Sequence, residues 1–438
     1  MLGVARSKLR LRRVLIISPH FPPTNTPDLQ RVRMLLPFFR ENGWNAEVLS
    51  VSPELVAAPL DPWLAEGLPL GIKVHRVKAL GLGWSRIPGL GALGKRSLWS
   101  LARAGNRLLA KGGFDLVYFS TTVVEVHLLG PRWKKKFGVP FVMDYQDPWV
   151  NDYYHEHPDV VPPGGRLKYA LADALHRWME PHVLRECAGI TSVSPEYPIQ
   201  LVRRYNWLGG LASLVQPFPG AQRDFERLAD SKITQEYFDP SDGRIHWVYV
   251  GVVIPGMLPI LRALFTAITT KMPSEKLKLL SLHFIGTSYA AGSRAVPRVL
   301  PLAAEFGLAE QVHERCERIP YAQTLMCLSD ADALLAIGSD DPGYTASKIY
   351  PYLLARKPLL AIYHERSSIN ELVRKVGGAV CIPFATPLDE DALAQSISKA
   401  WLDGEEFTKL YSLVDLAFEP YTDHGSAAAL CRFLEERF

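Results

Sequence analysis

The chain of 438 residues is longer than one hydrophobic core usually supports, and 48% of its residues are hydrophobic, so we expect two domains. Its 49 basic and 45 acidic residues leave a net charge of only +4, which argues against nucleic acid as an obligatory partner of the whole molecule. The five cysteines lie far apart, with no CxxC pair and no zinc-like histidine spacing. We therefore expect a reduced, cytosolic protein without a disulfide framework.

The first half of the chain alternates short apolar runs with helical patterns. Residues 1–13 are basic, and the apolar run after them is too short for a secretory signal or a membrane-spanning helix. We interpret this start as a solvated tail, with attraction to anionic lipid as the alternative. Strands are predicted at 14–18, 47–51, 74–77, 114–120, 141–145, 188–195 and 214–219, and helices at 29–41, within 121–138 and at 166–187, the last kinked or divided by Pro181.

The stretch 80–113 differs from its surroundings because it combines Trp, Lys and Arg residues with Leu and Gly. Its second half has the spacing of a basic amphipathic helix, and residues 132–136 add a second basic cluster. Such a helix can lie on a bilayer with its cations toward lipid phosphates and Trp at the interface. The alternative is a surface helix packed on the sheet with its charged face in water.

The alternation restarts after the polar stretch 217–243, which we take as the domain boundary. Two α/β domains in series, each a doubly wound parallel sheet, are therefore expected. The predicted strands of this second half are 245–251, 280–286, 331–338, 359–363 and 379–383, and its predicted helices are 258–270, 389–403 and two closing stretches.

The segment 331–363 reads as strand, loop, helix and strand, a βαβ unit of a parallel sheet. Thr345, Ser347 and Lys348 stand where its helix begins, so backbone N–H groups, hydroxyls and an ammonium could converge on an anion. We interpret this as a phosphate site. Gly251 and Gly286 end two earlier strands, where glycine allows a ligand to approach the backbone, although such glycines are also common for structural reasons.

Several motifs in this order resemble a retaining family 4 glycosyltransferase of the GT-B fold, as found in bacterial envelope polysaccharide synthesis. No single motif is specific, but the ordered set spans nearly the whole chain. The motifs are Phe21-Pro22-Pro23 with Arg31, Gly43-Trp44, His127-Leu128-Leu129-Gly130, Asp144-Tyr145-Gln146-Asp147-Pro148-Trp149, Ser192-Val193-Ser194, Tyr249-Val250-Gly251, Phe284-Ile285-Gly286, and Ser347-Lys348-Ile349-Tyr350 with Lys357-Pro358.

The resemblance implies two Rossmann-like domains facing a cleft. Residues 1–218 would bind a glycan or lipid-linked acceptor and 219–419 a nucleotide sugar, with a final helix at about 420–438 packing back on the first domain. It implies sugar transfer with retention. The nucleotide sugar would be a co-substrate, and neither a metal nor another cofactor is expected, because helix N-termini and basic side chains stabilise the departing diphosphate. The protein would be cytoplasmic, with association at the inner face of the membrane as a further option.

The resemblance also assigns roles to individual residues, each with a plainer alternative. Lys348 could be a solvated lysine, His127 a satisfied core residue, Asp147 a helix cap, and Arg31 one partner of a surface ion pair. The expected donor diphosphate site is Lys348, Ser347, Thr345 and Arg31; the nucleotide and sugar cleft is Gly251, Gly286 and Tyr344; the catalytic residues are His127 and Asp147.

The chain departs from the family pattern at positions that usually meet the donor. Gly343 and Pro351 stand where two glutamates are common, and Val252 and Met257 replace an Arg and a Lys. An active transferase is therefore weighed against a protein that keeps the fold but only binds a sugar nucleotide or glycan within a polysaccharide assembly. A nucleotide-sugar epimerase of the same fold is a weaker third hypothesis. Substitute side chains are expected among Asp340, Asp341 and Arg262.

Overall fold

The computed structural model describes residues 10–86, 91–150, 165–288, 295–341 and 347–437. The chain divides into two compact units: unit 1 comprises Met1–Pro219 and Asp423–Phe438, and unit 2 comprises Gly220–Thr422. The last helix of the chain thus belongs to unit 1, although the whole of unit 2 separates it in sequence from the remainder of that unit.

Unit 1 is built on one parallel sheet of seven strands. They are β1 (Arg12–Ile17), β2 (Trp44–Val51), β3 (Lys73–Val77), β4 (Leu116–Ser120), β5 (Phe141–Tyr145), β6 (Gly189–Ser192) and β7 (Ser213–Val215). Their spatial order is β3-β2-β1-β4-β5-β6-β7. The direction of this order reverses between β1 and β4, and in open α/β sheets a ligand crevice lies at such a point, beyond the carboxyl ends of the strands.

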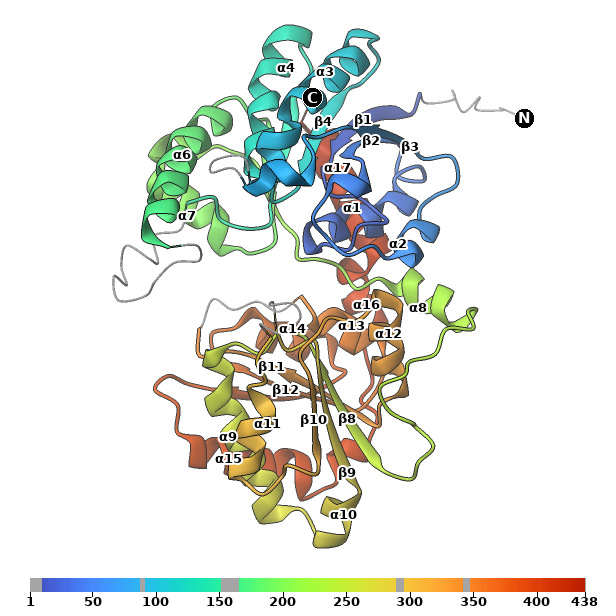
Figure 1. The fold of residues 1–438 in the computed structure, drawn as a ribbon, viewed down its shortest axis with the longest axis vertical. Coiled ribbons are helices and arrows are strands. Elements are labelled where there is room, and N and C mark those ends of the chain that lie inside the picture. Colours follow the sequence, from blue (N-terminus) through green and yellow to red (C-terminus); the bar gives the residue numbers. More distant parts are fainter. Residues whose placement is uncertain (1–9, 87–90, 151–164, 289–294, 342–346, 438) are drawn as a thin grey trace, which may run out of the picture. The chain divides into compact units, whose positions relative to one another are not determined.

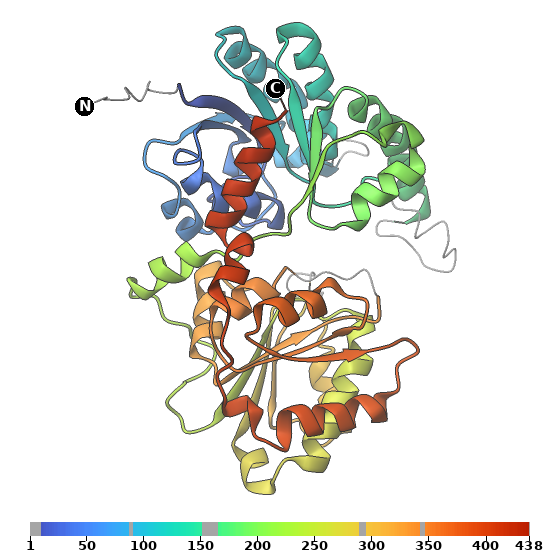
Figure 2. The same ribbon diagram turned by 180° about the vertical axis from the view of Figure 1, so that it is seen from behind.

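Helices cover both faces of this sheet. Alternate residues of β1 face opposite cores: Ile17 packs with Leu101 on one side, and Ile16 packs with Leu430 on the other. Figures 1 and 2 show the red C-terminal helix lying beside the blue N-terminal elements of unit 1. The helices are α1 (Gln30–Leu35), α2 (Pro62–Glu66), α3 (Leu93–Ala110), α4 (Leu129–Phe137), α6 (Arg166–Leu184), α7 (Glu196–Arg204) and α17 (Asp423–Glu435).

Two helices of unit 1 are shorter than their sequence patterns. The pattern at 29–41 forms α1 and then a 3-10 turn at Leu36–Phe38, because Pro37 has no backbone N–H to continue the α-helical bonding. The helix predicted after β4 starts as a 3-10 helix at Val124–Leu128 before α4. It ends at Gly138, whose φ of +71° is the left-handed conformation that glycine adopts easily. By contrast, α6 continues through its internal proline.

Unit 2 is built on a parallel sheet of six strands. They are β8 (Ile245–Val250), β9 (Leu280–Ile285), β10 (Val312–Arg315), β11 (Ala333–Ile337), β12 (Leu359–His364) and β13 (Val380–Phe384), and their order is β10-β9-β8-β11-β12-β13. This order reverses between β8 and β11. The sequence pattern missed β10, because this edge strand is short and carries His, Glu and Arg instead of an apolar run.

The helices of unit 2 also pack on both faces of their sheet. Trp247 of β8 contributes to one core with Leu264, whereas its neighbour Val248 contributes to the opposite core with Leu353. The predicted βαβ unit is confirmed, since β11 and β12 pair in parallel. The helices are α8 (Gln222–Ala229), α9 (Leu258–Lys271), α10 (Ser274–Leu279), α11 (Val299–Glu305), α12 (Tyr321–Asp330), α13 (Ile349–Leu354), α14 (Ser368–Val376), α15 (Glu390–Ile397) and α16 (Asp415–Phe418).

Candidate functional site

The side chain of Lys348 occupies the reversal point of the sheet in unit 2. Lys348 directly precedes α13, and its Nζ donates a hydrogen bond of 2.8 Å to the hydroxyl of Tyr249 at the end of β8. The same ammonium lies 4.7 Å from the centre of the Tyr249 ring. Tyr352 fixes α13 in this place, because its hydroxyl accepts from the Val250 N–H at 2.6 Å and donates to the Val250 carbonyl at 3.1 Å.

The Lys348 ammonium has no carboxylate partner among the residues that the structure describes. Burial, which disfavours the charged form, lowers its pKa to about 8. A poorly hydrated ammonium without a counter-ion gains more from binding an anion than a solvated lysine does. This side chain is therefore suited to hold a phosphate group.

Gly251 makes room for this lysine. Its φ of +140° is a backbone conformation that favours glycine, and a Cβ atom at this position would displace the Lys348 ammonium from its place. Gly286, with a φ of +75°, follows β9 and donates its N–H to the Arg315 carbonyl. The nearest atom that a Cβ there would meet is 3.9 Å away, so Gly286 owes its identity to backbone conformation and not to crowding.

The structure describes only some of the other residues expected around the donor, and those have partners of their own or lie partly exposed. Ser347 is partly exposed next to Lys348, whereas Thr345, Tyr344 and Gly343 lie outside the described residues. Among the substitutes expected for the missing charged residues, Arg262 pairs instead with Glu305 at 2.9 Å. Asp340 accepts a hydrogen bond from Ser339 and donates its N–H to Gly256, and Asp341 donates its N–H to the Ser339 hydroxyl.

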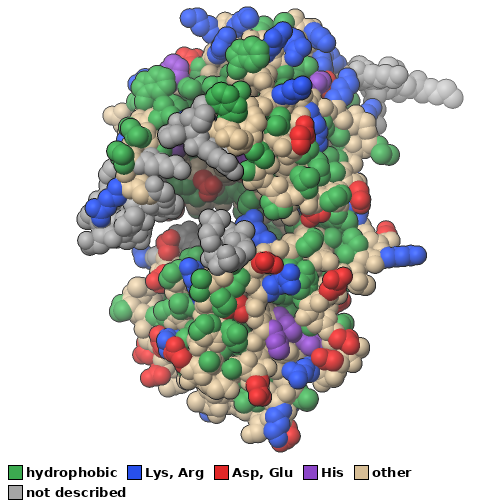
Figure 3. Space-filling view, in the orientation of Figure 1, with side chains coloured by type: hydrophobic (Ala, Val, Ile, Leu, Met, Phe, Trp, Pro, Cys, Tyr) green, Lys and Arg blue, Asp and Glu red, His purple; other side chains and the backbone are tan. Residues whose placement is uncertain are grey.

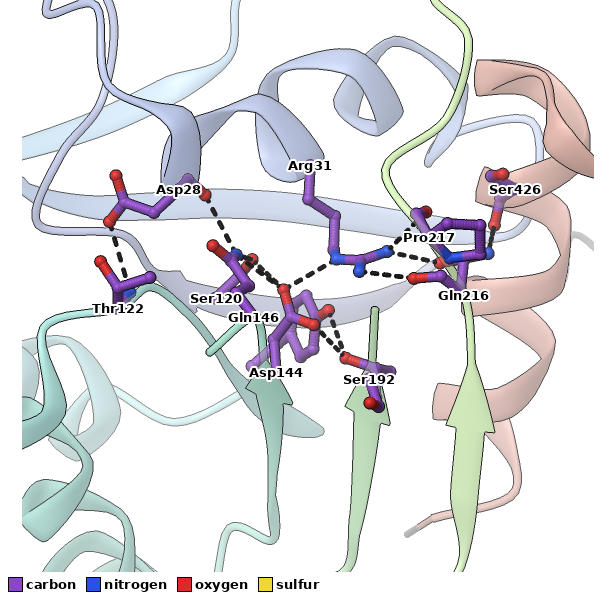
Figure 4. Close-up of polar contacts among 12 residues, drawn as sticks. Asp28, Arg31, Ser120, Thr122, Asp144, Gln146, Ser192, Gln216, Pro217 and Ser426 are labelled. Atoms are coloured by element: carbon purple, nitrogen blue, oxygen red, sulfur yellow. Dashed lines mark hydrogen bonds and ion pairs between the residues drawn. The ribbon is translucent and has the colours of Figure 1, made fainter. Parts of the chain in front are cut away.

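Arg31 is a structural cation of unit 1 and not a surface residue. Its side chain is 0% exposed, and its Nε donates to the Asp144 carboxylate at 2.8 Å, while Nη2 donates to the Gln216 carbonyl at 2.6 Å. Asp144 also accepts from Ser120 and Thr191 at 2.8 and 2.7 Å. Figure 4 shows this network joining α1, β5 and the segment after β7. The alternative of a surface ion pair is therefore wrong, since the guanidinium is buried and already neutralised by Asp144. The expected contact of Arg31 with a donor diphosphate stays a prediction.

His127 is buried in the apolar core of unit 1. Its Nδ1–H donates to the Val124 carbonyl at 3.1 Å, and its ring lies 5.3 Å from that of Phe119 and 4.8 Å from that of Trp149. Burial lowers its pKa to about 4, so the ring is neutral at physiological pH. Its Nε2 has no hydrogen-bond partner among the described residues. A core histidine with both nitrogens hydrogen-bonded was the alternative, and among the described residues only Nδ1 has a partner.

Asp147 follows β5 at the carboxyl edge of the sheet, and its side chain is exposed. Partial desolvation, and then the negative charge of Asp28, raise the pKa of this carboxyl above its ordinary value. No side-chain hydrogen bond of Asp147 occurs within the described residues, so nothing there shows that it caps a helix. The position suits a group that accepts a hydrogen bond or a proton from a ligand.

Two features of these sites escaped the sequence analysis. Tyr249 supports Lys348 although 99 residues separate them, so no local pattern could connect them. In unit 1, His20 and Asp28 form a hydrogen-bonded pair beyond β1. The only sequence signal for this pair is a histidine two residues after a predicted buried strand.

Comparison with known proteins identifies the fold. No protein-family model and no curated protein sequence matches the chain. Among solved structures, it is similar to Anabaena Alr3699/HepE in complex with UDP-glucose, with a TM-score of 0.59 and 13% identity over 97% of this chain and 100% of that one. It is also similar to a glycosyltransferase from Rickettsia africae (TM-score 0.58, 13% identity, 97% and 98% covered) and to the N-terminal domain of Candida albicans trehalose-6-phosphate phosphatase (0.56, 13%, 99% and 99%).

At such identities the likeness shows the fold alone. The two parallel sheets and these neighbours confirm the predicted α/β class, with two Rossmann-like domains of the GT-B type. Within the described residues, no helix has both the length and the hydrophobicity needed to cross a bilayer. Nor does this part of the chain bring together three or more His, Cys, Asp or Glu side chains in a way that could hold a metal ion.

Proposed function

We propose that the protein is a glycosyltransferase that moves a sugar from a nucleotide-sugar donor to a glycan or lipid-linked acceptor. The observation that carries this proposal is the Lys348 ammonium, which lies at the reversal point of unit 2 without a carboxylate partner among the described residues. As the bond between sugar and diphosphate breaks, negative charge grows on the diphosphate, and a fixed cation stabilises it. Ser347 adds a hydroxyl beside this cation.

The likeness to a protein solved with UDP-glucose supports a uridine diphosphate sugar as the first donor to try. Retention, independence of metal and other cofactors, and a place in envelope polysaccharide synthesis remain predictions from the sequence resemblance. In this proposal unit 2 holds the donor through Lys348, Ser347 and the backbone near Gly251. Unit 1 receives the acceptor near Asp147.

A second candidate is a protein of the same fold that binds a sugar nucleotide or glycan but does not transfer a sugar. Gly343 and Pro351 replace two glutamates that are common in the resembled family, and Pro351 lies within α13 directly after the Lys348 region. Arg262 does not compensate, since it pairs with Glu305. The transferase and a non-catalytic protein that binds a sugar nucleotide both require nucleotide binding at Lys348, and turnover separates these two.

We further propose that unit 1 rests on the inner face of the membrane through α3. Residues 67–114 contain nine Lys and Arg residues and no Asp or Glu. Trp99, 71% exposed, lies under the Arg103 guanidinium, 5.5 Å from it, an arrangement suited to the interface of an anionic bilayer. Figure 3 shows blue side chains gathered at the α3 and α4 end of unit 1. The exposed row on α3, four residues apart at each step, is Lys95, Trp99, Arg103 and Arg107, and Lys111 continues it directly after the helix.

Nucleotide binding tests the glycosyltransferase proposal directly. Calorimetry and thermal-shift measurements with UDP, GDP, ADP, CMP and their sugar conjugates should reveal saturable binding of one diphosphate. Lys348→Met keeps an apolar side chain on Tyr249 but removes the charge, and should weaken that binding about 10- to 100-fold. Lys399→Met, at an exposed lysine on the helical segment after α15, is the matched control and should bind like the wild type.

The turnover of sugar conjugates then separates the two candidates. Release of free sugar or its transfer to an acceptor supports the transferase. Binding without any turnover favours the non-catalytic protein. Folded wild-type protein that binds no nucleotide at millimolar concentration would contradict the transferase and leave only a non-catalytic protein that binds a glycan.

A further inference from the structure

Three histidines lie side by side on one face of the sheet in unit 2. His246, His283 and His313 belong to the adjacent strands β8, β9 and β10, and the last two are paired in register. The ring of His283 lies 5.1 Å from that of His246 on one side and 5.1 Å from that of His313 on the other. Figure 3 shows histidine side chains, in purple, gathered on the surface of unit 2. We call these three residues the histidine row.

Hydrogen bonds fix the positions of the protons in the neutral row. The Asp242 carboxylate, whose pKa is held below its ordinary value by the Arg244 N–H and by His246, accepts from Nε2 of His246 at 3.0 Å. Nδ1 of His246 therefore has a lone pair and accepts from Nε2 of His283 at 2.9 Å. A proton added to Nδ1 of His246 removes the acceptor of this bond. A proton added to His283 places a cation beside two other imidazoles.

Burial and the neighbouring rings keep the row neutral. His283 is 5% exposed, and desolvation, followed by the charges of His313 and His246, lowers its pKa to about 3. Burial and the charge of Arg244 also lower the pKa of the more exposed His313. In an open chain both imidazoles titrate near pH 6.5 or about there, so they stabilise the closed form above that pH and lose this contribution as the pH falls.

The charges around the row do not offset this penalty. Asp242 favours a cation at His283, but Arg244 opposes it. The Asp332 carboxylate accepts from the backbone N–H of His246, and the Glu314 carboxylate accepts from N–H groups at the start of α11. A pocket of about 400 Å³ gives water access to the row, and its polar lining residues are Glu236, Tyr237, His283, His313, Glu314 and Arg315.

One short segment, residues 235–242, covers the row. Phe238 stacks on the first two rings of the row, those of β8 and β9, with ring centres 4.8 and 4.7 Å away. The Tyr237 hydroxyl donates to Gln323 of α12 at 2.6 Å. A segment anchored by two aromatic side chains can open locally while the core of unit 2 stays folded.

We propose that the histidine row is an acid-sensitive switch, whose neutral rings hold the segment 235–242 against the sheet and whose protonated rings release it below about pH 6. Release takes Phe238 off the row, so that water solvates the charged imidazoles, and it separates Tyr237 from α12. The switch lies within unit 2 and operates independently of sugar transfer.

Hydrogen exchange of the full-length protein, measured by mass spectrometry between pH 7.5 and 5 and corrected for the intrinsic effect of pH, tests the switch. The N–H groups of Tyr237 and Phe238 report on the segment, because both donate to the side-chain oxygen of Gln235 in the closed form. Their exchange should accelerate by up to about tenfold per pH unit below 6.5 for each histidine that takes up a proton. The strands β8 and β11 should stay protected.

The variants remove the titrating groups. In His283→Gln/His313→Gln neither side chain can take up a proton, while the first amide can still donate to His246, so the acceleration should disappear. His313→Gln alone changes only an exposed side chain and should reduce the acceleration even if the double variant does not fold. His182→Gln is the matched control, because His182 is exposed in unit 1 and its ring is stacked 5.9 Å from that of Trp178. This control should respond to pH like the wild type.

Equal protection of the segment at pH 7.5 and 5 in the wild type would overturn the inference. An acceleration that persists undiminished in His313→Gln and in the double variant would overturn it as well, because another group would then be titrating. Exchange that rises equally throughout unit 2 would show general acid unfolding in place of a local release.

Discussion

Arg31 and Lys348 are both cations near the reversal point of a parallel sheet, yet their surroundings differ. The Arg31 guanidinium is fully buried and donates to the Asp144 carboxylate, so its charge is neutralised within unit 1. The Lys348 ammonium meets a hydroxyl, an aromatic ring and a glycine, and no carboxylate among the described residues. This difference indicates that Arg31 stabilises the fold of unit 1, whereas Lys348 is suited to bind an anion.

The largest expected effect is on the stability of unit 1. Arg31→Met leaves the Asp144 carboxylate buried without its cation and should lower the free energy of unfolding by about 3–5 kcal/mol. Urea denaturation followed by circular dichroism measures this. Lys348→Met should cause no such loss, because it removes a charge that burial already disfavours.

The double variant Arg31→Met/Asp144→Leu is the control for that prediction. Removing both charges avoids the unpaired carboxylate, so the double variant should be more stable than Arg31→Met alone. If Arg31→Met were as stable as the wild type, the buried pair would not hold the strands together, and the contrast with Lys348 would fail.

The pH dependence of donor binding should show an effect of intermediate size. Burial lowers the pKa of Lys348 to about 8, and a bound diphosphate favours the protonated form, so binding takes up a proton above this pH. The affinity for UDP-glucose should therefore be level near neutral pH and fall by up to about tenfold per pH unit above 8. Calorimetry from pH 6.5 to 9.5 measures it, and UDP-glucose is suitable because its diphosphate is esterified at both ends.

The stability of the ligand-free protein depends on pH in the direction opposite to donor affinity. The folded-state pKa of Lys348 lies below its ordinary value of 10.5, so between about pH 8 and 10.5 the unfolded chain binds more protons than the ligand-free fold. The contribution of Lys348 to stability thus rises with pH through this window, while donor affinity falls. If the affinity of Lys348→Met for UDP-glucose still fell above pH 8, another group would be responsible for the pH dependence.

The smallest expected effect is on membrane binding by exposed cations, which lack a carboxylate partner among the described residues but remain in water. Arg103 on α3 is exposed beside Trp99, and Arg103→Gln should weaken binding to vesicles of phosphatidylglycerol and phosphatidylcholine by about 1 kcal/mol. Vesicle co-sedimentation at low and high salt measures this, and Lys399→Gln in unit 2 is the control. Equal binding of all variants would show that α3 is a solvated surface helix.

The sequence alone was sufficient for the fold class. The strands of a parallel sheet are covered on both faces, so they appear as nearly continuous apolar runs such as 333–337 and 359–363, whose pairing the structure confirms. The same rule explains the failure at β10, because an edge strand that carries His, Glu and Arg gives no apolar run. The shortened α1 likewise follows from one proline, whose effect a helical spacing pattern does not weigh.

Only the tertiary structure decided what the individual site residues do. The pattern at 347–348 placed Lys348 at a helix start, since that information is local, but the supporting Tyr249 is 99 residues away. Arg31 and Asp144 are 113 residues apart, and only their contact shows that Arg31 is a buried structural cation. The contact between His20 and Asp28 was likewise not evident in the sequence, because the ionisation of Asp28 depends on burial and hydrogen bonds that only the folded chain assembles.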